Sequence, residues 1–175
     1  YIIYLGLSLI EFVILIAAKM PVFDAMNTTF GTAGTGGFGI KNSSLSGYSV
    51  TIQWIVTIFM MLFGVNFNAY YIMIFGSIKK ALSMEEVRAY FGIILTAIVI
   101  ITINIYSICS GVWDAVTKSA FQVGSIITTT GFATTDFNIW PQTSKTILVL
   151  LMFIGACAGS TGGGIKVSRF VILIK

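Results

Sequence analysis

Long stretches without charge limit what this chain can fold into. No Asp, Glu, Lys or Arg occurs between Val50 and Ile78, between Ala89 and Trp113, or between Thr146 and Ile165. Each stretch reaches or exceeds the roughly 20 residues that an apolar helix needs to cross a bilayer. A fourth apolar run, Tyr1 to Ala18, is interrupted only by Glu11. The sequence therefore predicts an all-α protein that crosses a membrane several times.

The composition agrees with a membrane protein and excludes several kinds of chemistry. Apolar residues make up 57% of the chain and charged residues 9%, whereas soluble domains are usually about 25% charged. The net charge of +4 comes from scattered Lys and Arg residues and not from a basic run with interleaved aromatics, so no nucleic-acid partner is expected. The chain has no His, which excludes Cys/His metal sites and His-based acid–base catalysis.

The beginning of the sequence and its two cysteines add two further expectations. The chain starts inside an apolar run without a Met, and it lacks a basic leader and a small-residue cleavage site. We therefore expect a piece of a longer protein, and not a signal peptide. Cys109 and Cys157 both lie in apolar runs, where a small hydrophobic side chain is a more common role than a disulfide.

The same order of elements occurs twice, which indicates an internal repeat. The order is an apolar helix, a short segment, a Gly/Thr loop and a second apolar helix. When Gly37-Phe38 is aligned with Gly131-Phe132, an Asp heads each short segment and a Gly lies inside each following helix. These landmarks are Asp24, Asp114, Gly64 and Gly155. The sequence thus predicts two domains, residues 1–80 and 81–175.

The two short segments determine the expected topology. They run from Pro21 to about Ala33 and from Val112 to about Ile127, too short to cross about 30 Å of hydrocarbon as helices. We expect re-entrant half-helices, because unwound backbone at membrane depth survives only where protein or a water-filled cavity covers it. A small excess of basic residues on the opposite side places the Gly/Thr loops on the non-cytoplasmic side. The cytoplasmic set is Lys79, Lys80, Arg88, Lys166, Arg169 and Lys175, and the other set is Lys19, Lys41, Lys118 and Lys145.

The Gly/Thr loops contain the residue types that carbonyl coordination of a cation requires. Glycine tolerates backbone conformations that let successive carbonyls point the same way, and a ring of such carbonyls can replace the hydration shell of K⁺. The half-helix before each loop would direct its negative dipole end towards the ion, and threonine hydroxyls would add ligands at the inner mouth. The expected ion-binding residues are Thr35, Gly36, Gly37, Phe38, Thr129, Thr130, Gly131 and Phe132.

Other interpretations of the Gly-rich sequences fit less well. Residues 34–39 match the dinucleotide fingerprint G-x-G-x-x-G, but that motif follows a strand, and here a membrane helix flanks it. Residues 159–164 resemble a phosphate-binding loop, but Ile165 separates the last Gly from Lys166. Small residues also permit tight helix packing, although their recurrence at matching places in a repeat favours ion binding.

A third Gly-rich stretch interrupts the last apolar run, from Gly155 to Arg169. Five glycines within ten residues cannot hold a straight membrane helix. We expect two half-helices joined by an irregular loop beneath the filter. A flexible constriction there would act as a gate, and a fixed kink is the alternative. The candidate gate residues are Gly159, Ser160, Thr161, Gly162, Gly163 and Gly164.

These motifs resemble those of the TrkH/KtrB/HKT superfamily of K⁺ transporters. Thr32 to Gly39 resembles the second pore loop of that family, Ile127 to Phe137 the third, and Gly155 to Arg169 the intramembrane gating loop of the third repeat. Gly64 to Tyr71 is similar to the TrkH version of the second repeat's last helix. The resemblance covers essentially the whole chain. It implies four helix–pore-loop–helix repeats around one pore, of which this sequence holds two.

The resemblance also implies a function. It makes Gly37 and Gly131 the filter glycines, and Gly36 departs from a Thr-Thr-Gly pattern, leaving a backbone ligand without a hydroxyl. It implies K⁺ uptake through a pore in the cell membrane, with no chemical catalysis and no cofactor. It further implies a homodimer in membrane lipid, assembled on a cytoplasmic nucleotide-binding regulatory subunit.

Other functions remain open. A Na⁺ or Na⁺/K⁺-coupled transporter of the same superfamily is the main alternative. A membrane-embedded enzyme fits less well, because three Asp, three Glu and no His supply few acids, bases or metal ligands. A structural membrane subunit is the third possibility.

Several polar residues outside the loops are further candidates. Asn66 and Asn68 lie midway in an expected spanning helix, where they would line the pore or bond across helices. Lys166 and Arg169 would face the pore or meet a regulator. Glu11 is a carboxylate within an apolar run, which indicates either a function or solvation near the interface.

One helix start is also predicted. Ser83 and Glu86, three residues apart, have the spacing of a capping box and place the start of the third long helix there.

Overall fold

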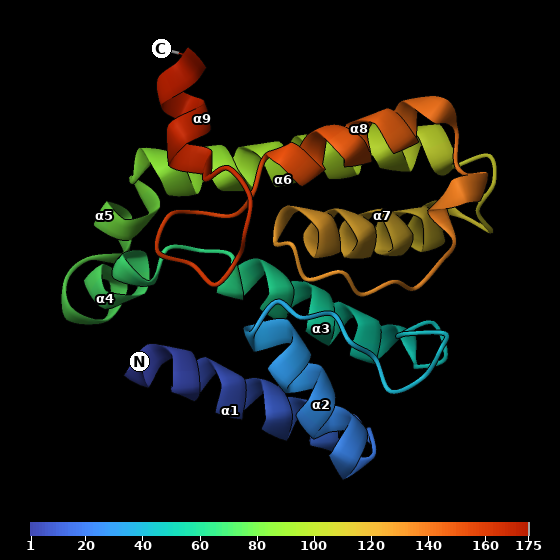
Figure 1. Ribbon diagram of the computed structural model, residues 1–175, viewed down its shortest axis with the longest axis horizontal. Coiled ribbons are helices and arrows are strands. Elements are labelled where there is room, and N and C mark those ends of the chain that lie inside the picture. The colour runs from blue at the N-terminus through green and yellow to red at the C-terminus, as the bar shows by residue number, and fades with distance from the viewer. Residues whose placement is uncertain (175) are drawn as a thin grey trace.

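The computed structural model describes residues 1–174, which form helices joined by loops (Figure 1). The helices are α1 (Ile2–Ala17), α2 (Val22–Ala33), α3 (Val50–Phe63), α4 (Phe67–Phe75), α5 (Ile78–Leu82), α6 (Glu85–Ile105), α7 (Val112–Ile127), the short 3-10 helix η1 (Phe137–Ile139), α8 (Gln142–Phe153) and α9 (Val167–Ile174). Within the described range, strand-like pairing is limited to one isolated bridge between Ile154 and Ile165. The fold is therefore all-α.

Two groups of three helices have matching arrangements. α1 packs against α2 and α3, which also pack on each other, and α6 packs in the same way with α7 and α8. Contacts between α3 and α7 join the two groups. Figure 1 shows α2 lying against α3 in the lower group, α7 lying beneath α8 in the upper group, and the loops after α2 and α7 running between them.

The two short helices begin and end where the sequence predicts. α2 starts after Pro21, with Asp24 in its first turn, and α7 starts after Gly111, with Asp114 in its first turn. Carboxylates there interact favourably with the positive end of the helix dipole. Asp114 is also held by an ion pair with Lys118, one turn on, at 2.7 Å.

The apolar run from Val50 to Ile78 is not one helix, contrary to expectation. α3 ends at Phe63, and α4 starts at Phe67 in a direction 89° away. Asn66 caps the start of α4, because its side-chain oxygen accepts a hydrogen bond from the Asn68 backbone N–H at 2.9 Å. Gly64 lies at the break, where a Cβ would collide with the Tyr90 hydroxyl and approach the Thr128 methyl to 2.9 Å.

α6 starts at Glu85, where the sequence predicts a helix start, but the predicted capping box is wrong. Met84, and not Ser83, is the residue before the helix, and the Ser83 hydroxyl donates to the Lys80 carbonyl at 2.9 Å. The Glu86 carboxylate therefore does not turn back to a cap. It accepts hydrogen bonds from residues of other elements, Ala158 and Asn66.

The lengths of the helices bear on how the chain meets a membrane. Among the described residues, α6 is long and apolar enough to cross alone, and α3 with α4 meets the same criteria only as a bent pair. α1 and α8 are apolar but shorter. The long apolar runs are thus interrupted more often than the sequence led us to expect.

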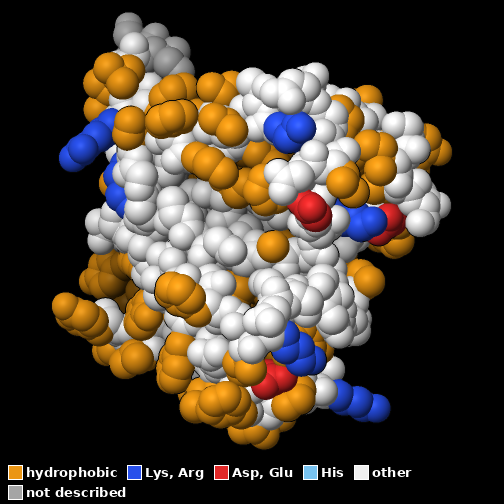
Figure 2. Space-filling view, turned by 45° about the vertical axis from the view of Figure 1, so that its right-hand side comes forward, with side chains coloured by type: hydrophobic (Ala, Val, Ile, Leu, Met, Phe, Trp, Pro, Cys, Tyr) orange, Lys and Arg blue, Asp and Glu red, His pale blue; other side chains and the backbone are white. Residues whose placement is uncertain are grey.

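Apolar side chains cover much of the outside of the molecule. Figure 2 shows them spread over the surface, with few charged side chains, several of which lie beside one of opposite charge. Leu5, Leu9 and Val13 are exposed along α1, and Leu95 and Val99 along α6. Contiguous apolar surface of this kind is unsuited to water and marks a lipid or protein contact.

The close packing at Gly64 generates a stability prediction. Gly64→Ala should destabilise the protein by about 2 kcal/mol, because the added methyl group forces Tyr90 and Thr128 apart in a packed interior. The measurement is the thermal unfolding midpoint in detergent. Gly92→Ala is the matched control: a Cβ there meets nothing within 4 Å, and Ala is the better helix former. Equal midpoints for the two variants would contradict the packing argument.

Candidate functional site

The candidate site lies where the loops that follow α2 and α7 meet. Gly37 of the first loop packs directly against the backbone of the second, so that a Cβ on Gly37 would collide with the Thr130 carbonyl oxygen. Farther along, Leu45 donates its backbone N–H to the Ala133 carbonyl at 3.1 Å. The Ser44 hydroxyl oxygen accepts from the Ala133 N–H at 3.1 Å. The two loops, 94 positions apart in sequence, are therefore adjacent in space.

The two loops share an unusual backbone conformation. The φ angles of Thr35 and Gly37 are 49° and 64°, and those of Thr129 and Gly131 are 58° and 91°. L-residues rarely occupy this left-handed region, and glycine does so readily. Positive φ values therefore recur at the same two positions of each loop, with a threonine at the first and a glycine at the second.

Hydrogen bonds to the preceding helix hold each loop in this shape. The N–H groups of Gly36 and Gly37 both donate to the Gly31 carbonyl, at 2.8 and 3.4 Å. The equivalent N–H groups of the second loop, from Thr130 and Gly131, donate to the Ser125 carbonyl at 2.9 and 3.3 Å. The amide donors therefore point back into the helix end.

The carbonyl groups of the same residues are left free. Among residues 1–174, no protein donor bonds to the backbone carbonyl of Thr35, Gly36, Gly37, Thr129, Thr130 or Gly131. Of these six residues, Thr130 is buried, Gly36 and Gly131 are exposed, and the other three are half-buried. A set of unpartnered carbonyl oxygens at the ends of two short helices is chemically suited to a desolvated cation, which the negative ends of the helix dipoles also favour.

The threonine hydroxyls of the second loop bond within the protein. The Thr130 hydroxyl is buried and bonds with that of Thr128 at 2.8 Å. Thr129 donates its hydroxyl to the Thr128 carbonyl at 2.7 Å and accepts from the Gly163 N–H at 2.7 Å. Gly36, which occupies the position of Thr130 in the first loop, therefore lacks the hydroxyl contact that Thr130 makes with Thr128.

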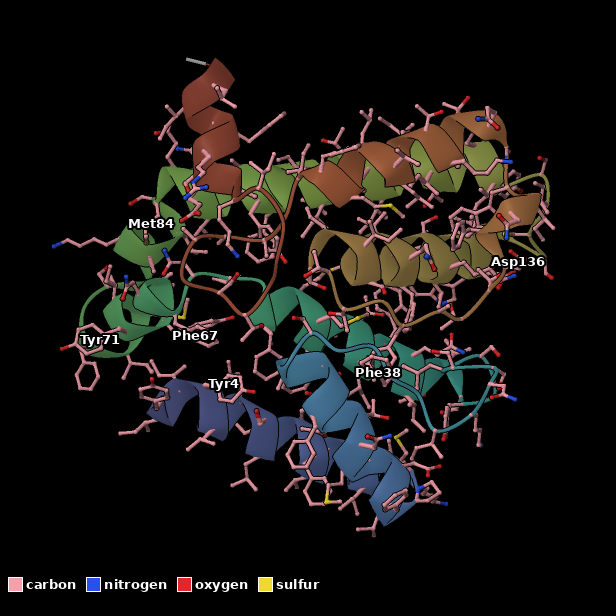
Figure 3. The ribbon with its side chains drawn as sticks, in the orientation of Figure 1. Tyr4, Phe38, Phe67, Tyr71, Met84 and Asp136 are labelled. Atoms are coloured by element: carbon pink, nitrogen blue, oxygen red, sulfur yellow. The ribbon has the colours of Figure 1, made fainter. Side chains whose placement is uncertain are left out.

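The two loops differ in how their phenylalanines lie. Phe132 is buried, and its ring packs on Gly31 of α2, where a Cβ would come within 2.8 Å of the ring's ζ carbon. Phe38, at the matching position of the first loop, is 81% exposed and lies on the loop that crosses α3 (Figure 3). The Gly131 backbone is likewise open, with nothing within 4 Å of a Cβ there, whereas Gly37 is in close contact.

Residues 39–49, the outer segment that follows the first loop, are bonded to the start of α2. The Tyr48 hydroxyl donates to an Asp24 carboxylate oxygen at 2.6 Å, and the Lys41 ammonium lies 4.3 Å from the centre of the Tyr48 ring. Burial, together with the adjacent Asp24 carboxylate, raises the pKa of Tyr48 to about 12. The phenol is therefore protonated at neutral pH and remains a donor to Asp24.

A polar depression lies beside this outer segment. Its volume is about 390 Å³, and Ser44, Ala133 and Asp136 are among the residues that line it. Figure 3 labels Asp136 at the far end of the second loop. The depression gives polar access from solvent to the outer ends of both loops.

The Gly-rich stretch forms a closed loop between α8 and α9, residues 154–166. Its two ends are joined by backbone hydrogen bonds, from Gly155 N–H to Ile165 O at 2.8 Å and from Ile165 N–H to Phe153 O at 3.3 Å. The Lys166 ammonium bonds to the Gly162 carbonyl inside the loop. The last apolar run is therefore broken as the glycines predict.

The Gly-rich loop contacts both Gly/Thr loops close to the ends of α2 and α7. Besides the Thr129–Gly163 bond, the Thr35 hydroxyl donates to the Thr161 carbonyl at 3.3 Å. A Cβ at Gly162 would lie 3.1 Å from the Thr128 carbonyl oxygen. The loop thus contacts the inner ends of the two loops at equivalent threonines.

The same Gly-rich loop also fills the break between α3 and α4. Cys157 donates its N–H to Gly64 O at 3.0 Å, Thr161 donates to Phe63 O at 3.4 Å, and Phe67 donates to Gly159 O at 3.1 Å. Helix ends leave backbone groups unpaired, and here two broken helices supply each other's partners.

Other sequence candidates lie apart from the loop contact. Asn68 and Arg169 are exposed. Asn66 is 8% exposed and caps α4 beside the Gly-rich loop. Glu11 is fully buried, and neither of its carboxyl oxygens has a hydrogen-bond partner among the described residues. Burial excludes solvation of Glu11 at the interface in this structure.

Sequence reasoning missed one contact of the site. Glu86 was assigned to a helix cap, yet its carboxylate reaches the Ala158 N–H of the Gly-rich loop at 2.6 Å. The sequence signal for this contact is Gly64 with Asn66, because a glycine followed by an N-cap residue indicates a helix break. In the structure this break lies beside Glu86.

This chain is similar to known potassium transporters over most of its length. A family model described as "TrkH: Cation transport protein" matches residues 93–175. The Trk system potassium uptake proteins TrkH of Salmonella typhimurium and Escherichia coli K12 are 37% and 36% identical over 162 residues, which cover 90% of this chain. The crystal structure of the potassium transporter TrkH from Vibrio parahaemolyticus superposes with a TM-score of 0.91 over 98% of this chain, at 33% identity.

The matches extend over only part of those proteins. The aligned region is 34% of each of the two curated relatives and 38% of the crystallised chain, so the sequence spans about a third of their length. The similarity nevertheless covers both helix groups and all three Gly-rich loops. Residues 93–175 thus match the TrkH family model, and nearly the whole chain is similar to TrkH potassium transporters in sequence and fold.

Proposed function

We propose that this chain forms two adjacent units of a pore that takes up K⁺ across the cell membrane. The observation that carries the proposal is the pair of matching loops, residues 34–38 and 128–132, which share their backbone conformation, leave their carbonyls free and lie side by side. The relatives' description as potassium uptake proteins supports K⁺ as the ion. Each unit is one of the expected domains, residues 1–80 and 81–175.

The mechanism is dehydration of the ion by backbone carbonyls. Carbonyl oxygens of Thr35, Gly36 and Gly37 and of their counterparts Thr129, Thr130 and Gly131 replace water around the ion. The C-terminal ends of α2 and α7 contribute partial negative charge close to it. The site needs no catalytic side chain, and transport proceeds without an enzymatic step or cofactor.

Two features support further units on either side. Within the chain, Phe132 packs on Gly31 of the other unit, and Gly37 packs on Thr130. The matching groups, Phe38 and Gly131, have no such neighbour among the described residues. Further units that repeat the packing between these two would cover Phe38 and Gly131. Four such units would complete the ring of carbonyls. The short alignment against the relatives agrees with this interpretation.

The Gly-rich loop serves as the gate in this proposal. It lies against the inner ends of both filter segments through Thr35 and Thr129, so its position controls whether an ion can leave the filter. The candidate gate residues Gly159 to Gly164 form the part of the loop nearest those contacts. Lys166 stabilises the loop from within through its bond to Gly162.

Assembly follows from the same proposal. The protein is a multi-pass membrane protein, its exposed apolar faces meet lipid, and it acts as a homodimer with a cytoplasmic nucleotide-binding regulatory subunit. The relatives are named as parts of a Trk system, which agrees with a separate regulatory partner. Arg88 and Arg169 are exposed and available to such a partner.

The filter assignment predicts a change in ion selectivity. Gly131→Ser in the full-length protein should lower the K⁺/Na⁺ permeability ratio about tenfold, a change of about 1.4 kcal/mol. Ser disfavours a φ of 91°, and the neighbouring unit that the proposal places against Gly131 leaves no room for a side chain. The measurement is the ratio of K⁺ and Na⁺ fluxes in proteoliposomes. Gly6→Ser, in helix α1 where a Cβ meets nothing within 4 Å, is the control. An unchanged K⁺/Na⁺ permeability ratio for Gly131→Ser would contradict the filter assignment.

If a neighbouring unit covers Phe38 in the full-length protein, truncation of this exposed ring should lower the stability. Phe38→Ala should destabilise the full-length protein by about 3 kcal/mol, the typical cost of truncating a buried Phe, although the ring is exposed here. Phe153→Ala, which removes a ring that is 64% exposed on the outer face of α8, should have little effect. Thermal unfolding in detergent compares the two, and equal midpoints would argue against a unit seated on Phe38.

A further inference from the structure

Glu86 connects two elements that are far apart in sequence. It is the second residue of α6 and is half-buried. One carboxylate oxygen accepts the Ala158 N–H of the Gly-rich loop at 2.6 Å, and the other accepts an amide N–H of the Asn66 side chain at 3.3 Å. Hydrogen bonds to a charged acceptor are about twice as strong as those between neutral groups. The first turn of α6 is thus bonded to both helix breaks.

Asn66 is itself fixed, so Glu86 bonds to an oriented partner. The Asn66 side-chain oxygen accepts the Asn68 N–H at 2.9 Å, which leaves its NH₂ group turned towards Glu86. A Cβ at Gly159 would lie 3.1 Å from that same oxygen. The amide therefore packs on the Gly-rich loop as well as capping α4.

This arrangement holds one arm of the Gly-rich loop, residues 157–159, from both sides. Cys157 and Gly159 bond to the backbone of the α3–α4 break, and Ala158 between them bonds to Glu86. The other arm, at Thr161 and Gly163, bonds to Thr35 and Thr129. A shift of residues 157–159 therefore moves the part of the loop that contacts the filter segments.

We propose that Glu86 is a positioning residue that holds the Gly-rich loop beneath the filter and keeps it closed. Through Glu86, the position of α5 and the start of α6 determines the position of the loop. Figure 1 shows α4, α5 and the Gly-rich loop at the same end of the molecule, and Figure 3 labels Met84 and Phe67 beside this junction. The inference rests on the proposed function, because the loop is a gate only if ions pass the filter above it.

The loop contains its own reporter for a test. Cys157 is fully buried and Cys109 is the other free cysteine, so full-length protein with Cys109→Ser and no other accessible thiol reports on the loop. The measurement is the rate at which a neutral maleimide labels Cys157 in detergent. Glu86→Ala removes the acceptor and should accelerate labelling about tenfold, as expected for the loss of one charge-assisted hydrogen bond.

Two further variants separate loop release from a change of charge beside the thiol. Glu86→Gln removes the charge but keeps an oxygen that accepts the Ala158 N–H, so labelling should rise less than about threefold. Asn66→Asp removes the donor and places a second carboxylate opposite Glu86, which should release the loop. The added negative charge disfavours the thiolate, so faster labelling in this variant reports movement alone. Asp136→Asn, a distant carboxylate-to-amide change, should leave the rate unchanged.

Ion flux completes the test. Glu86→Ala and Asn66→Asp should raise ⁸⁶Rb⁺ flux into proteoliposomes without any regulator present, and Glu86→Gln should raise it less. Equal labelling in wild type, Glu86→Ala and Asn66→Asp overturns the role of Glu86, even if the wild type conducts. Equal acceleration by Glu86→Ala and Glu86→Gln, or unchanged or lower flux in the released variants, also overturns it. A wild type that carries neither K⁺ nor Rb⁺ under any condition contradicts the proposed function instead, and the labelling result then still decides whether Glu86 positions the loop.

Discussion

The structure depends on backbone groups that broken helices leave without partners. Inside a membrane, such groups are satisfied by protein or by water in a cavity, since lipid offers no hydrogen bonds. The α3–α4 break exposes the carbonyls of Phe63 and Gly64, and the α8–α9 break supplies the N–H groups of Thr161 and Cys157 that bond to them. Each break is stable because the other is present. The Gly-rich loop is consequently fixed beside the first helix group, although it belongs to the second.

The sequence predicted elements whose signals are local. The two short helices end at Ala33 and Ile127 as expected, because Pro and Asp mark their starts and Gly/Thr loops mark their ends. The break at Gly64 to Asn66 was not predicted, since the surrounding run is apolar and only tertiary partners make the break favourable. Glu86 was misassigned for the same reason: its spacing from Ser83 is local, whereas its partners lie 20 and 72 residues away. The assignment of the filter and gate residues to ion transport remains a prediction.

The repeat is conserved in backbone geometry more closely than in side-chain chemistry. Gly36 and Thr130 have the same hydrogen-bonding pattern through their N–H groups, although one has no side chain to contribute. Gly31 and Ser125 both accept two loop N–H groups through their carbonyls, although Gly31 packs on the Phe132 ring and Ser125 donates its hydroxyl to the Phe132 carbonyl. A site made of carbonyls requires a particular chain path, and several residue types can follow that path.

The bridge between Ile154 and Ile165 has a consequence for how the Gly-rich loop can vary. Because the two ends of the loop are bonded to each other, the relative placement of α8 and α9 is set at the neck and not by the residues between. Insertions or deletions at the tip alter how far the loop reaches towards the centre of the molecule without shifting the register of either helix. Related chains can therefore differ in loop length while retaining the same surrounding scaffold.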